Sequence, residues 1–172
     1  AATTVENYKK LKDAGIGTYI LFQETYHKES YEQLHPNGPK SNYAYHTEAM
    51  DRAMEGGIDD VGCGVLFGLN MYRYDFVGLL MHAEHLEAVH GVGPHTISVP
   101  RICPADDINP DEFTNAISDE VLHLINNKYF PEKAYNVKSE DLYRCSDLKI
   151  TETVFTSSFE KADIWLTYIS DG

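Results

Sequence analysis

The sequence predicts an α/β protein with parallel strands, arranged as about three consecutive βα units. The same order occurs three times along the chain: an amphipathic helix, a glycine, a short apolar strand and a polar turn. Gly15, Gly57 and Gly91 mark the joints at intervals of 42 and 34 residues, which is the repeat length of βα units. Parallel strands joined by right-handed helical crossovers are the economical way to fold such a pattern.

Length and composition limit the function classes. At 172 residues, with 42% hydrophobic and 24% charged residues, the chain can form a sizeable core but is short of the roughly 250 residues of a complete α/β barrel. A net charge of −13 argues against nucleic acid and anionic membranes as partners, because both need a basic surface. No apolar run approaches the roughly 20 residues of a membrane span, and no signal peptide is visible. We therefore expect a cytoplasmic protein.

The first βα unit is expected to consist of a helix from Thr3 to Ala14 and a strand from Thr18 to Phe22. The apolar strand residues give way abruptly to QETYH at 23–27, as expected when a buried parallel strand presents polar groups at its carboxyl end. A long loop should follow, because HPNGP at 35–39 is rich in turn formers.

The next two units repeat the pattern. A helix is expected from about Asn42 to Glu55 and a strand from Ile58 to Phe67. The third unit combines a helix from about Tyr74 to Val89 with a short strand from Thr96 to Val99.

The alternation does not continue to the end of the chain. A helix is expected from Ser118 to about Asn127, and residues 154–159 and 164–169 could form strands without a crossover helix before either. The sequence thus predicts an α/β domain at 1–127 and a divergent, unassigned C-terminal tail at 128–172.

Three neighbouring parallel strands would bring a set of polar residues and glycines together at their carboxyl ends. The set contains Gln23, Glu24, Tyr26, the glycine segment with Gly62 and Gly64, His95, Ser98 and Arg101. Such groups could hold an amino-acid-like ligand, with arginine binding a carboxylate, glutamate an ammonium group or a ribose hydroxyl, and glycine backbone a close-packed ring. The alternative is that Glu24 and Arg101 form a simple ion pair at the sheet rim.

Metal ligands are not indicated. The segment HAEH, with His82, Glu84 and His85, lacks the HExxH spacing that puts two imidazoles on one helical face, so a solvated helix face is favoured over a metal site. Three widely spaced cysteines, at 63, 103 and 145, indicate reduced thiols and do not cluster as zinc or iron-sulfur ligands do.

Several longer segments resemble a known family. They are GIGTYILFQETYH at 15–27, HPNGPK at 35–40, AMDRAM at 49–54, GIDDVGCGVLFGL at 57–69, GLLMHAEHLE at 78–87, GVGPHTISVPR at 91–101 and PADDI at 104–108. Over about residues 4–123 the sequence resembles that of the radical S-adenosylmethionine (SAM) tyrosine lyases. It is most similar to the branch that matures FeFe-hydrogenase, and the thiamine-pathway tyrosine lyase is a relative.

The resemblance implies a partial barrel of the TIM type, in which a 4Fe-4S cluster cleaves SAM to a 5′-deoxyadenosyl radical. The radical would abstract hydrogen from tyrosine, releasing p-cresol and a glycine-derived fragment that yields carbon monoxide and cyanide for hydrogenase assembly. By resemblance, the SAM-binding residues are Glu24, Gln23, His46, Gly62 and Gly64. The residues that face the tyrosine substrate are, by the same resemblance, Tyr26, His95, Ser98 and Arg101.

Three features depart from the family pattern. The cluster motif Cys-x3-Cys-x2-Cys does not occur in the sequence, so no cluster ligands are expected in this chain. His46 stands where an arginine usually binds the SAM carboxylate, and a neutral imidazole cannot form a bidentate grip. After about His123 the family's next strand does not appear.

We therefore expect a fragment of a radical SAM tyrosine lyase that is inactive alone. SAM and tyrosine are the expected ligands, and hydrogenase maturation proteins are possible partners. The alternative is a non-catalytic ligand-binding or barrel-docking module that self-associates through exposed sheet edges. A metal hydrolase that uses HAEH is a third, weaker idea.

Overall fold

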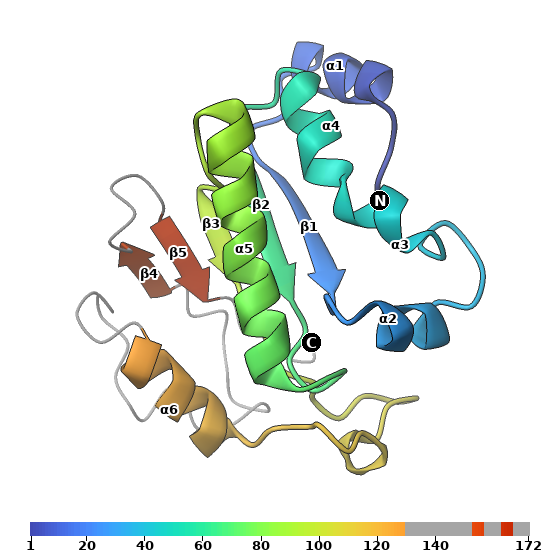
Figure 1. Cartoon of the computed structure of the whole chain (residues 1–172), viewed down its shortest axis with the longest axis vertical. Coiled ribbons are helices and arrows are strands. Elements are labelled where there is room, and N and C mark those ends of the chain that lie inside the picture. The colour runs from blue at the N-terminus through green and yellow to red at the C-terminus, as the bar shows by residue number, and fades with distance from the viewer. Residues whose placement is uncertain (130–152, 157–162, 167–172) are drawn as a thin grey trace.

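The computed structural model describes residues 1–129, 153–156 and 163–166. In chain order the elements are α1 (Val5–Asp13), β1 (Tyr19–Glu24), α2 (Lys28–Leu34), α3 (Tyr43–Thr47), α4 (Ala49–Glu55), β2 (Val61–Val65), α5 (Tyr72–His90), β3 (Thr96–Ser98), the 3-10 helix η1 (Pro110–Glu112), α6 (Asp119–Tyr129), β4 (Thr153–Thr156) and β5 (Asp163–Leu166). Figure 1 shows α4 and α5 packed over the same side of the sheet formed by β1, β2 and β3.

The sheet has the predicted parallel topology. Its strand order is β1-β2-β3, and both neighbouring pairs are parallel. Antiparallel β4 and β5 form a separate ladder, and β5 lies beside β3 (Figure 1). The expected α/β class with three consecutive parallel strands is therefore confirmed.

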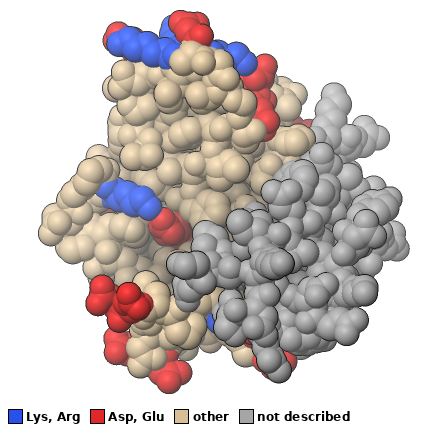
Figure 2. Space-filling model, turned by 180° about the vertical axis from the view of Figure 1, so that it is seen from behind, with Lys and Arg blue, Asp and Glu red and all other residues tan. Residues whose placement is uncertain are grey.

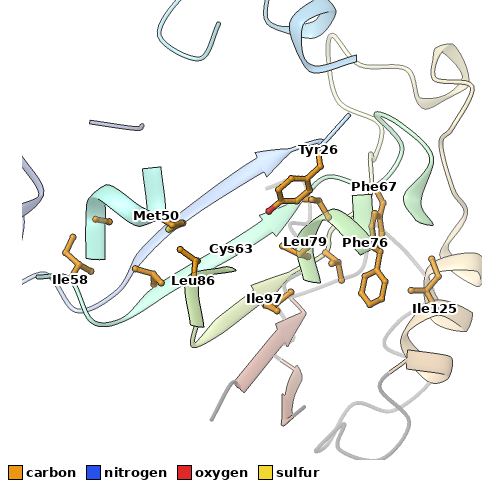
Figure 3. Close-up of a cluster of buried hydrophobic side chains, with 14 of the residues drawn as sticks. Tyr26, Met50, Ile58, Cys63, Phe67, Phe76, Leu79, Leu86, Ile97 and Ile125 are labelled. Atoms are coloured by element: carbon orange, nitrogen blue, oxygen red, sulfur yellow. The ribbon is translucent and has the colours of Figure 1, made fainter. Parts of the chain in front are cut away.

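Alternation along the strands separates two faces of the sheet. Val61, Cys63 and Val65 of β2 point toward the helices and belong to the buried core, together with Ile97 of β3. Figure 3 shows that Leu79 and Leu86 of α5 approach this cluster from the helix layer. A strand that contributes a buried side chain to the helix layer at every second residue can be held firmly even though it is short.

The opposite face carries the two β2 glycines. Gly64 is paired with Phe22 on one side and Ser98 on the other. A Cβ on Gly64 would lie 2.7 Å from Phe22 Cδ1 and 2.9 Å from the Ser98 carbonyl oxygen, and a Cβ on Gly62 would lie 2.9 Å from Ile20 Cγ1. Neighbouring strands thus leave no room for a side chain at either position, which explains both glycines structurally.

Two expected elements differ from the structure. Within the stretch expected to be loop, Lys28–Leu34 forms α2, which is capped by His27 through the Ser30 N–H and anchored by the fully buried Tyr31. The expected helix from Asn42 to Glu55 is divided into α3 and α4 at Glu48, whose ψ is 7°.

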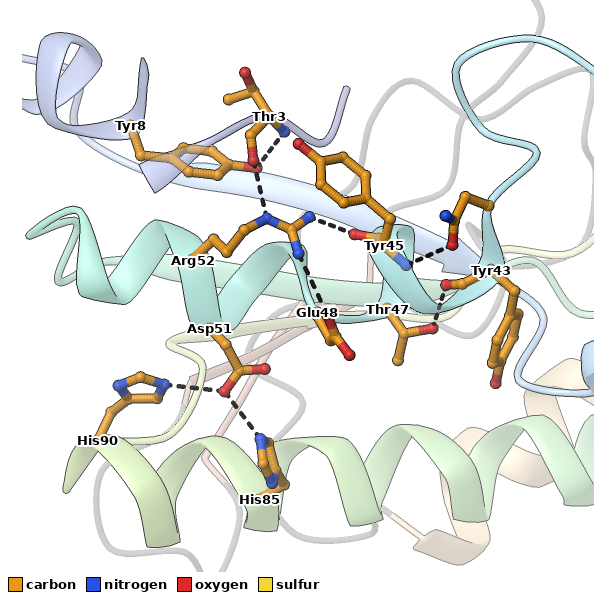
Figure 4. Close-up of polar contacts among 11 residues, drawn as sticks. Thr3, Tyr8, Tyr43, Tyr45, Thr47, Glu48, Asp51, Arg52, His85 and His90 are labelled. Carbon is orange, nitrogen blue, oxygen red and sulfur yellow. Dashed lines mark hydrogen bonds and ion pairs between the residues drawn. The ribbon is translucent and has the colours of Figure 1, made fainter. Parts of the chain in front are cut away.

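The break between α3 and α4 is held by polar contacts. Arg52 Nε donates to the Thr3 carbonyl at 2.9 Å, and Arg52 Nη2 donates to the Tyr45 carbonyl (Figure 4). The guanidinium also lies 3.8 Å from the centre of the Tyr45 ring. One side chain therefore ties α4 to both α3 and the N-terminal segment.

The tail prediction is only partly covered by the structure. β4 and β5 overlap the two stretches expected to form strands, while 130–152, 157–162 and 167–172 lie outside the described residues. The domain boundary at 127/128 stays a prediction, and α6 continues across it to Tyr129. Among the described helices, none combines the length and apolar character needed to cross a bilayer.

Candidate functional site

The carboxyl end of β1 has an unusual backbone. Glu24 has φ +70°, in the left-handed region that an L-residue with a long side chain rarely adopts. The pairing with β2 shifts register between Phe22 and Glu24, and the Leu66 N–H donates to the Glu24 carbonyl at 2.9 Å. Such bulges redirect a side chain at a strand end, and backbone strain of this kind concentrates at functional sites.

The Glu24 carboxylate is paired with Lys40. Lys40 Nζ lies 2.5 Å from Glu24 Oε1, and the two side chains are 40% and 18% exposed. The backbone of Lys40 is fixed as well, because the buried Tyr31 hydroxyl donates to its carbonyl at 2.7 Å. The predicted alternative, an ion pair between Glu24 and Arg101, is wrong.

An aromatic cluster underlies this ion pair. The Tyr31 ring stacks on His35 at 4.3 Å and meets Tyr43 edge-on at 5.2 Å and His46 at 5.7 Å. Burial, the Glu24 charge and Tyr43 raise the pKa of Tyr31 to about 12, so its phenol stays protonated and serves as a donor. The cluster joins α2, α3 and the loop between them into one support for Lys40.

Gln23 and His46 support the strand end from the helix side. The buried Gln23 amide donates to Thr47 Oγ1 at 2.9 Å. His46 is 2% exposed, and its Nε2 lies 2.9 Å from the Phe22 carbonyl oxygen. That carbonyl can only accept, so Nε2 carries the proton. Burial, reinforced by the Lys40 charge, lowers the pKa of His46 despite its bond to Phe22. A neutral imidazole bound to the backbone thus stands at the position where the resemblance implies an arginine.

Asp75, on the first turn of α5, holds the turn that follows β1. Its Oδ1 accepts from Thr25 Oγ1 at 2.7 Å and from the Tyr26 N–H at 2.8 Å. Burial raises the pKa of Asp75, although these two bonds favour the carboxylate. The sequence analysis did not single out this residue, and an isolated acid at the start of an apolar helix is the signal that could have identified it.

Tyr26 points into the core, as Figure 3 shows, and its hydroxyl lies 2.7 Å from His82 Nδ1. Burial lowers the pKa of His82 to about 4, so the ring is neutral and accepts from the phenol. The solvated helix face predicted for HAEH is therefore wrong at His82.

His85 contacts a different partner. Its Nε2 and that of His90 lie 2.9 Å and 3.1 Å from Asp51 Oδ1 (Figure 4). Burial works against ionisation of Asp51, but the bonds from His90 and His85 outweigh it and lower the pKa of Asp51. This cluster links α4 to α5.

The residues predicted on the third strand are divided between the two ends of the sheet. Ser98 is buried at the carboxyl end of β3, as predicted. His95 precedes β3, and its Nδ1 lies 3.6 Å from Asp60 Oδ1 just before β2 begins. His95 therefore lies at the amino end, and its predicted position beside the other site residues is wrong because the strand starts only at Thr96.

Arg101 lies past the carboxyl end of β3, where it forms an isolated bridge with Phe67. Its Nε donates to Asp119 Oδ1 at 2.5 Å, and Nη1 donates to the Ile102 carbonyl at 2.8 Å. The Arg101 and Asp119 side chains are 11% and 14% exposed. The pair anchors the start of α6 to the end of the sheet.

The face of the molecule opposite α5 is shown in Figure 2. Charged side chains gather at its upper end, over α1, and acidic ones gather toward its lower end. Between them the described surface is largely uncharged, apart from basic and acidic side chains that lie together near its middle.

The described residues do not fit a 4Fe-4S cluster. No group of three or more His, Cys, Asp or Glu side chains among them could hold a metal. Cys63 is a free thiol whose pKa burial raises to about 12, which is unlike a cluster ligand. Cys103 is disulfide-bonded, which corrects the expectation of reduced thiols throughout, and Cys145 lies outside the described residues.

SAM fits the carboxyl end of β1 better than a cluster does. The Glu24 and Lys40 charges lie side by side there, and polar and charged groups of a small ligand can pair with either of them. Lys40 is the partner of Glu24 that the sequence analysis missed, although its position just after the Pro-Asn-Gly-Pro turn was visible.

Comparisons with known proteins give consistent relatives. No family model matches the chain. The 2-iminoacetate synthase of Salmonella typhimurium is 35% identical over 100 residues, which cover 58% of this chain and 26% of that protein. The corresponding protein of Escherichia coli is 33% identical over 98 residues, covering 56% and 26%.

Two solved structures are similar as well. The crystal structure of HydG, a maturase of the FeFe-hydrogenase, is 66% identical with a TM-score of 0.68, covering 70% of this chain and 26% of that one. HydG from Carboxydothermus hydrogenoformans is 38% identical with a TM-score of 0.61, covering 73% and 30%. The chain thus spans about a quarter of the length of its relatives. Over that part, sequence and fold confirm the resemblance of this chain to the radical SAM tyrosine lyases, which are enzymes of the TIM-barrel type.

Proposed function

We propose that this chain forms the part of a radical SAM tyrosine lyase that binds SAM at the carboxyl end of β1. The observation that carries the proposal is the 66% identity to HydG over 70% of the chain, together with a strained, charged strand end at Glu24. The reaction of the whole enzyme would cleave tyrosine to p-cresol and a glycine-derived fragment that yields carbon monoxide and cyanide. Its product would serve hydrogenase maturation proteins in the cytoplasm.

The residues predicted to bind SAM would have different roles. Glu24 would contact SAM through its ammonium group or a ribose hydroxyl, because its carboxylate is the acidic group that the β1 bulge presents. Gln23 and His46 would hold the strand end in place through Thr47 and the Phe22 carbonyl. When bound together with a reduced cluster, SAM supplies the hydrogen-abstracting species.

The remaining predicted residues have less direct roles. Tyr26 is committed to His82 and to the Asp75 carboxylate, so it would position the turn rather than touch tyrosine. Ser98 would border the tyrosine subsite from β3, and Arg101 would shape it through α6.

We further propose that the 172 residues do not cleave SAM alone. Their three cysteines stand at 63, 103 and 145, which is not the Cys-x3-Cys-x2-Cys spacing. Anaerobic reconstitution with iron and sulfide should give no stoichiometric cluster absorption, no 5′-deoxyadenosine and no p-cresol, while equilibrium dialysis should detect SAM binding. A complete HydG treated in parallel provides the positive control. Stoichiometric cluster uptake with SAM cleavage would show the chain to be active alone, and failure to bind SAM would contradict the binding role.

A barrel-docking module is the second candidate. Within the described sheet β1 is an outer strand, and Ile20 on its helix-free face is 49% exposed. An outer strand of this kind offers backbone groups to another chain. Light scattering across a concentration series distinguishes this module from a chain that only binds ligand.

A further inference from the structure

We propose that this chain docks onto a second copy of itself through the outer edge of β1, with Ile20 of one copy opposite Ile20 of the other across a two-fold axis. The inference deepens the barrel-docking module proposed above and rests on it. It commits that module to one partner, a second copy, and to one assembly, a closed dimer.

The two outer strands of the described sheet differ in exposure. β3 has β5 beside it, and its three residues, Thr96, Ile97 and Ser98, are only 2–7% exposed. β1 lies on the other side of the sheet (Figure 1), and Ile20 is 49% exposed there. An outer strand is a template for pairing only where its edge is open. The described sheet therefore offers β1, and not β3, to a second copy.

The sequence of β1 lacks the features that protect natural edge strands. Such strands usually carry a lysine, a proline or an inward-pointing charge. From Tyr19 to Gln23 the strand reads YILFQ, with no proline and no charged side chain. The first charge is that of Glu24, which is already paired with Lys40. This edge is therefore unprotected along its central residues.

The backbone groups at Ile20 can pair with those of their own copy. The Tyr19 N–H donates to the Asp60 carbonyl at 2.9 Å, so by alternation both the N–H and the carbonyl of Ile20 point away from β2. When a residue lies opposite its own copy in an antiparallel ladder, the two residues can exchange two N–H···O bonds about a two-fold axis. Pairing centred one residue later would need the Phe22 carbonyl, which already accepts from His46. Ile20 is therefore the centre of the pairing.

This pairing joins the sheets of two copies into one continuous sheet. The two Ile20 side chains then lie next to each other on the helix-free face, because residues directly opposite in an antiparallel pair share a face. Both lose exposed apolar surface, which favours association. Each copy uses its open β1 edge in the contact while its β3 edge is covered, so the assembly closes at two copies.

The test places charge at residue 20 of the full chain. Ile20→Lys and Ile20→Glu each put like charges opposite one another, so each variant alone should dimerise at least about tenfold more weakly than the wild type. An equimolar mixture of the two should restore a one-to-one dimer, because a lysine then lies opposite a glutamate. Sedimentation velocity at physiological salt measures this, and the wild type should show monomers and dimers with no larger species.

Long-range charge cannot produce this pattern. The net charge of −13 repels a second copy, and Ile20→Lys reduces that repulsion, so its loss of association must be local. The matched control mixes Ile20→Glu with the double variant Ile20→Glu/Met81→Lys. It adds a lysine on the outer face of α5, where Met81 is 63% exposed, and should stay monomeric. Thermal unfolding of each variant verifies folding.

The outcomes separate this inference from the docking module. If the mixture of Ile20→Lys and Ile20→Glu stays monomeric, or if each variant alone associates like the wild type, residue 20 does not face its own copy. The inference is then overturned, while docking through another contact stands. Wild-type assemblies larger than a dimer overturn the closure. A wild type that stays monomeric at every concentration overturns the docking module, and this inference fails with it.

Discussion

Single polar side chains that are largely withdrawn from solvent determine how the carboxyl end of β1 is held, and the half-buried His82 shows this most clearly. Its ring meets the Tyr26 ring edge-on at 5.8 Å and accepts from the Tyr26 hydroxyl, while its Nε2 has no partner among the described residues. Burial keeps the ring neutral by lowering the pKa of His82 from 6.5 to about 4, with Asp51 and His85 nearby acting in opposite directions. A polar side chain of this kind makes stability depend on pH.

His82 should destabilise the fold as the solution becomes acidic. The unfolded chain binds a proton at His82 near pH 6.5 and the folded chain only near pH 4. Between these values the unfolded state holds more protons, so stability falls as pH falls, by at most about 1.4 kcal/mol per pH unit. Urea unfolding from pH 4 to 7 should therefore show a flatter pH dependence for His82→Gln than for the wild type.

Tyr26→Phe serves as the control for this measurement. It removes a hydrogen bond worth about 1 kcal/mol but leaves His82 buried, so it should lower stability at every pH and keep the slope. If the free energy of unfolding depended on pH in the same way for the wild type and His82→Gln, His82 would not be the source of the pH dependence.

At the scale of elements, periodicity predicted the helices and strands that bury a regular stripe. It failed where single contacts decide the structure. α2 depends on the His27 cap and on burial of one residue, Tyr31, neither of which produces a stripe in seven residues. The break between α3 and α4 depends on Thr47, whose hydroxyl turns back to the Tyr43 carbonyl at 2.9 Å. Such side-chain bonds compete with the helix and leave no periodic signal.

The contact between α5 and the turn after β1 depends on a glycine. A Cβ on Gly78 would lie 2.6 Å from Tyr26 Cγ, so the helix can approach the ring only without a side chain there. In an exposed helix, Gly→Ala stabilises by about 1 kcal/mol. Here Gly78→Ala should instead destabilise by about 1–3 kcal/mol, because the Tyr26 ring must move. Chemical denaturation measures whether Gly78→Ala lowers or raises the free energy of unfolding.

Gly17→Ala is the matched control for Gly78→Ala. Nothing lies within 4 Å of a Cβ at Gly17, and its φ is not positive, so this change should stay within about 0.5 kcal/mol of wild type. If Gly78→Ala were more stable than the wild type, the turn after β1 would be able to move the Tyr26 ring away from the added methyl group at little cost.

At the scale of the whole molecule, the sequence predicted which strands are neighbours and therefore that Glu24 and Ser98 lie at one end of the sheet. It placed His95 at the wrong end, because His95 precedes β3 and the length of that strand separates it from the carboxyl end. It also could not predict that Lys40 rather than Arg101 pairs with Glu24. Ion pairs between loops depend on tertiary structure, which pattern and spacing do not contain.

The outer edge of β1 determines how whole molecules should behave toward one another. The Tyr19 N–H donates to Asp60 beside β2, so by alternation the backbone of Ile20 points to the other side. His46 occupies the Phe22 carbonyl, which leaves Ile20 as the central open position of this edge. We expect self-association that grows with concentration and with salt, since a charge of −13 repels a second copy.

Ile20→Lys should suppress this association without lowering the midpoint of unfolding, because a lysine on an edge strand opposes pairing and Ile20 is already 49% exposed. Met81→Lys is the control. It places the same charge on the outer face of α5, where Met81 is 63% exposed, and should leave association unchanged. Sedimentation velocity across a concentration series measures both. If Met81→Lys gave monomers while Ile20→Lys still associated, the contact would lie on α5. The docking role of the sheet edge would then be excluded, while the proposed ligand site at Glu24 would be unaffected.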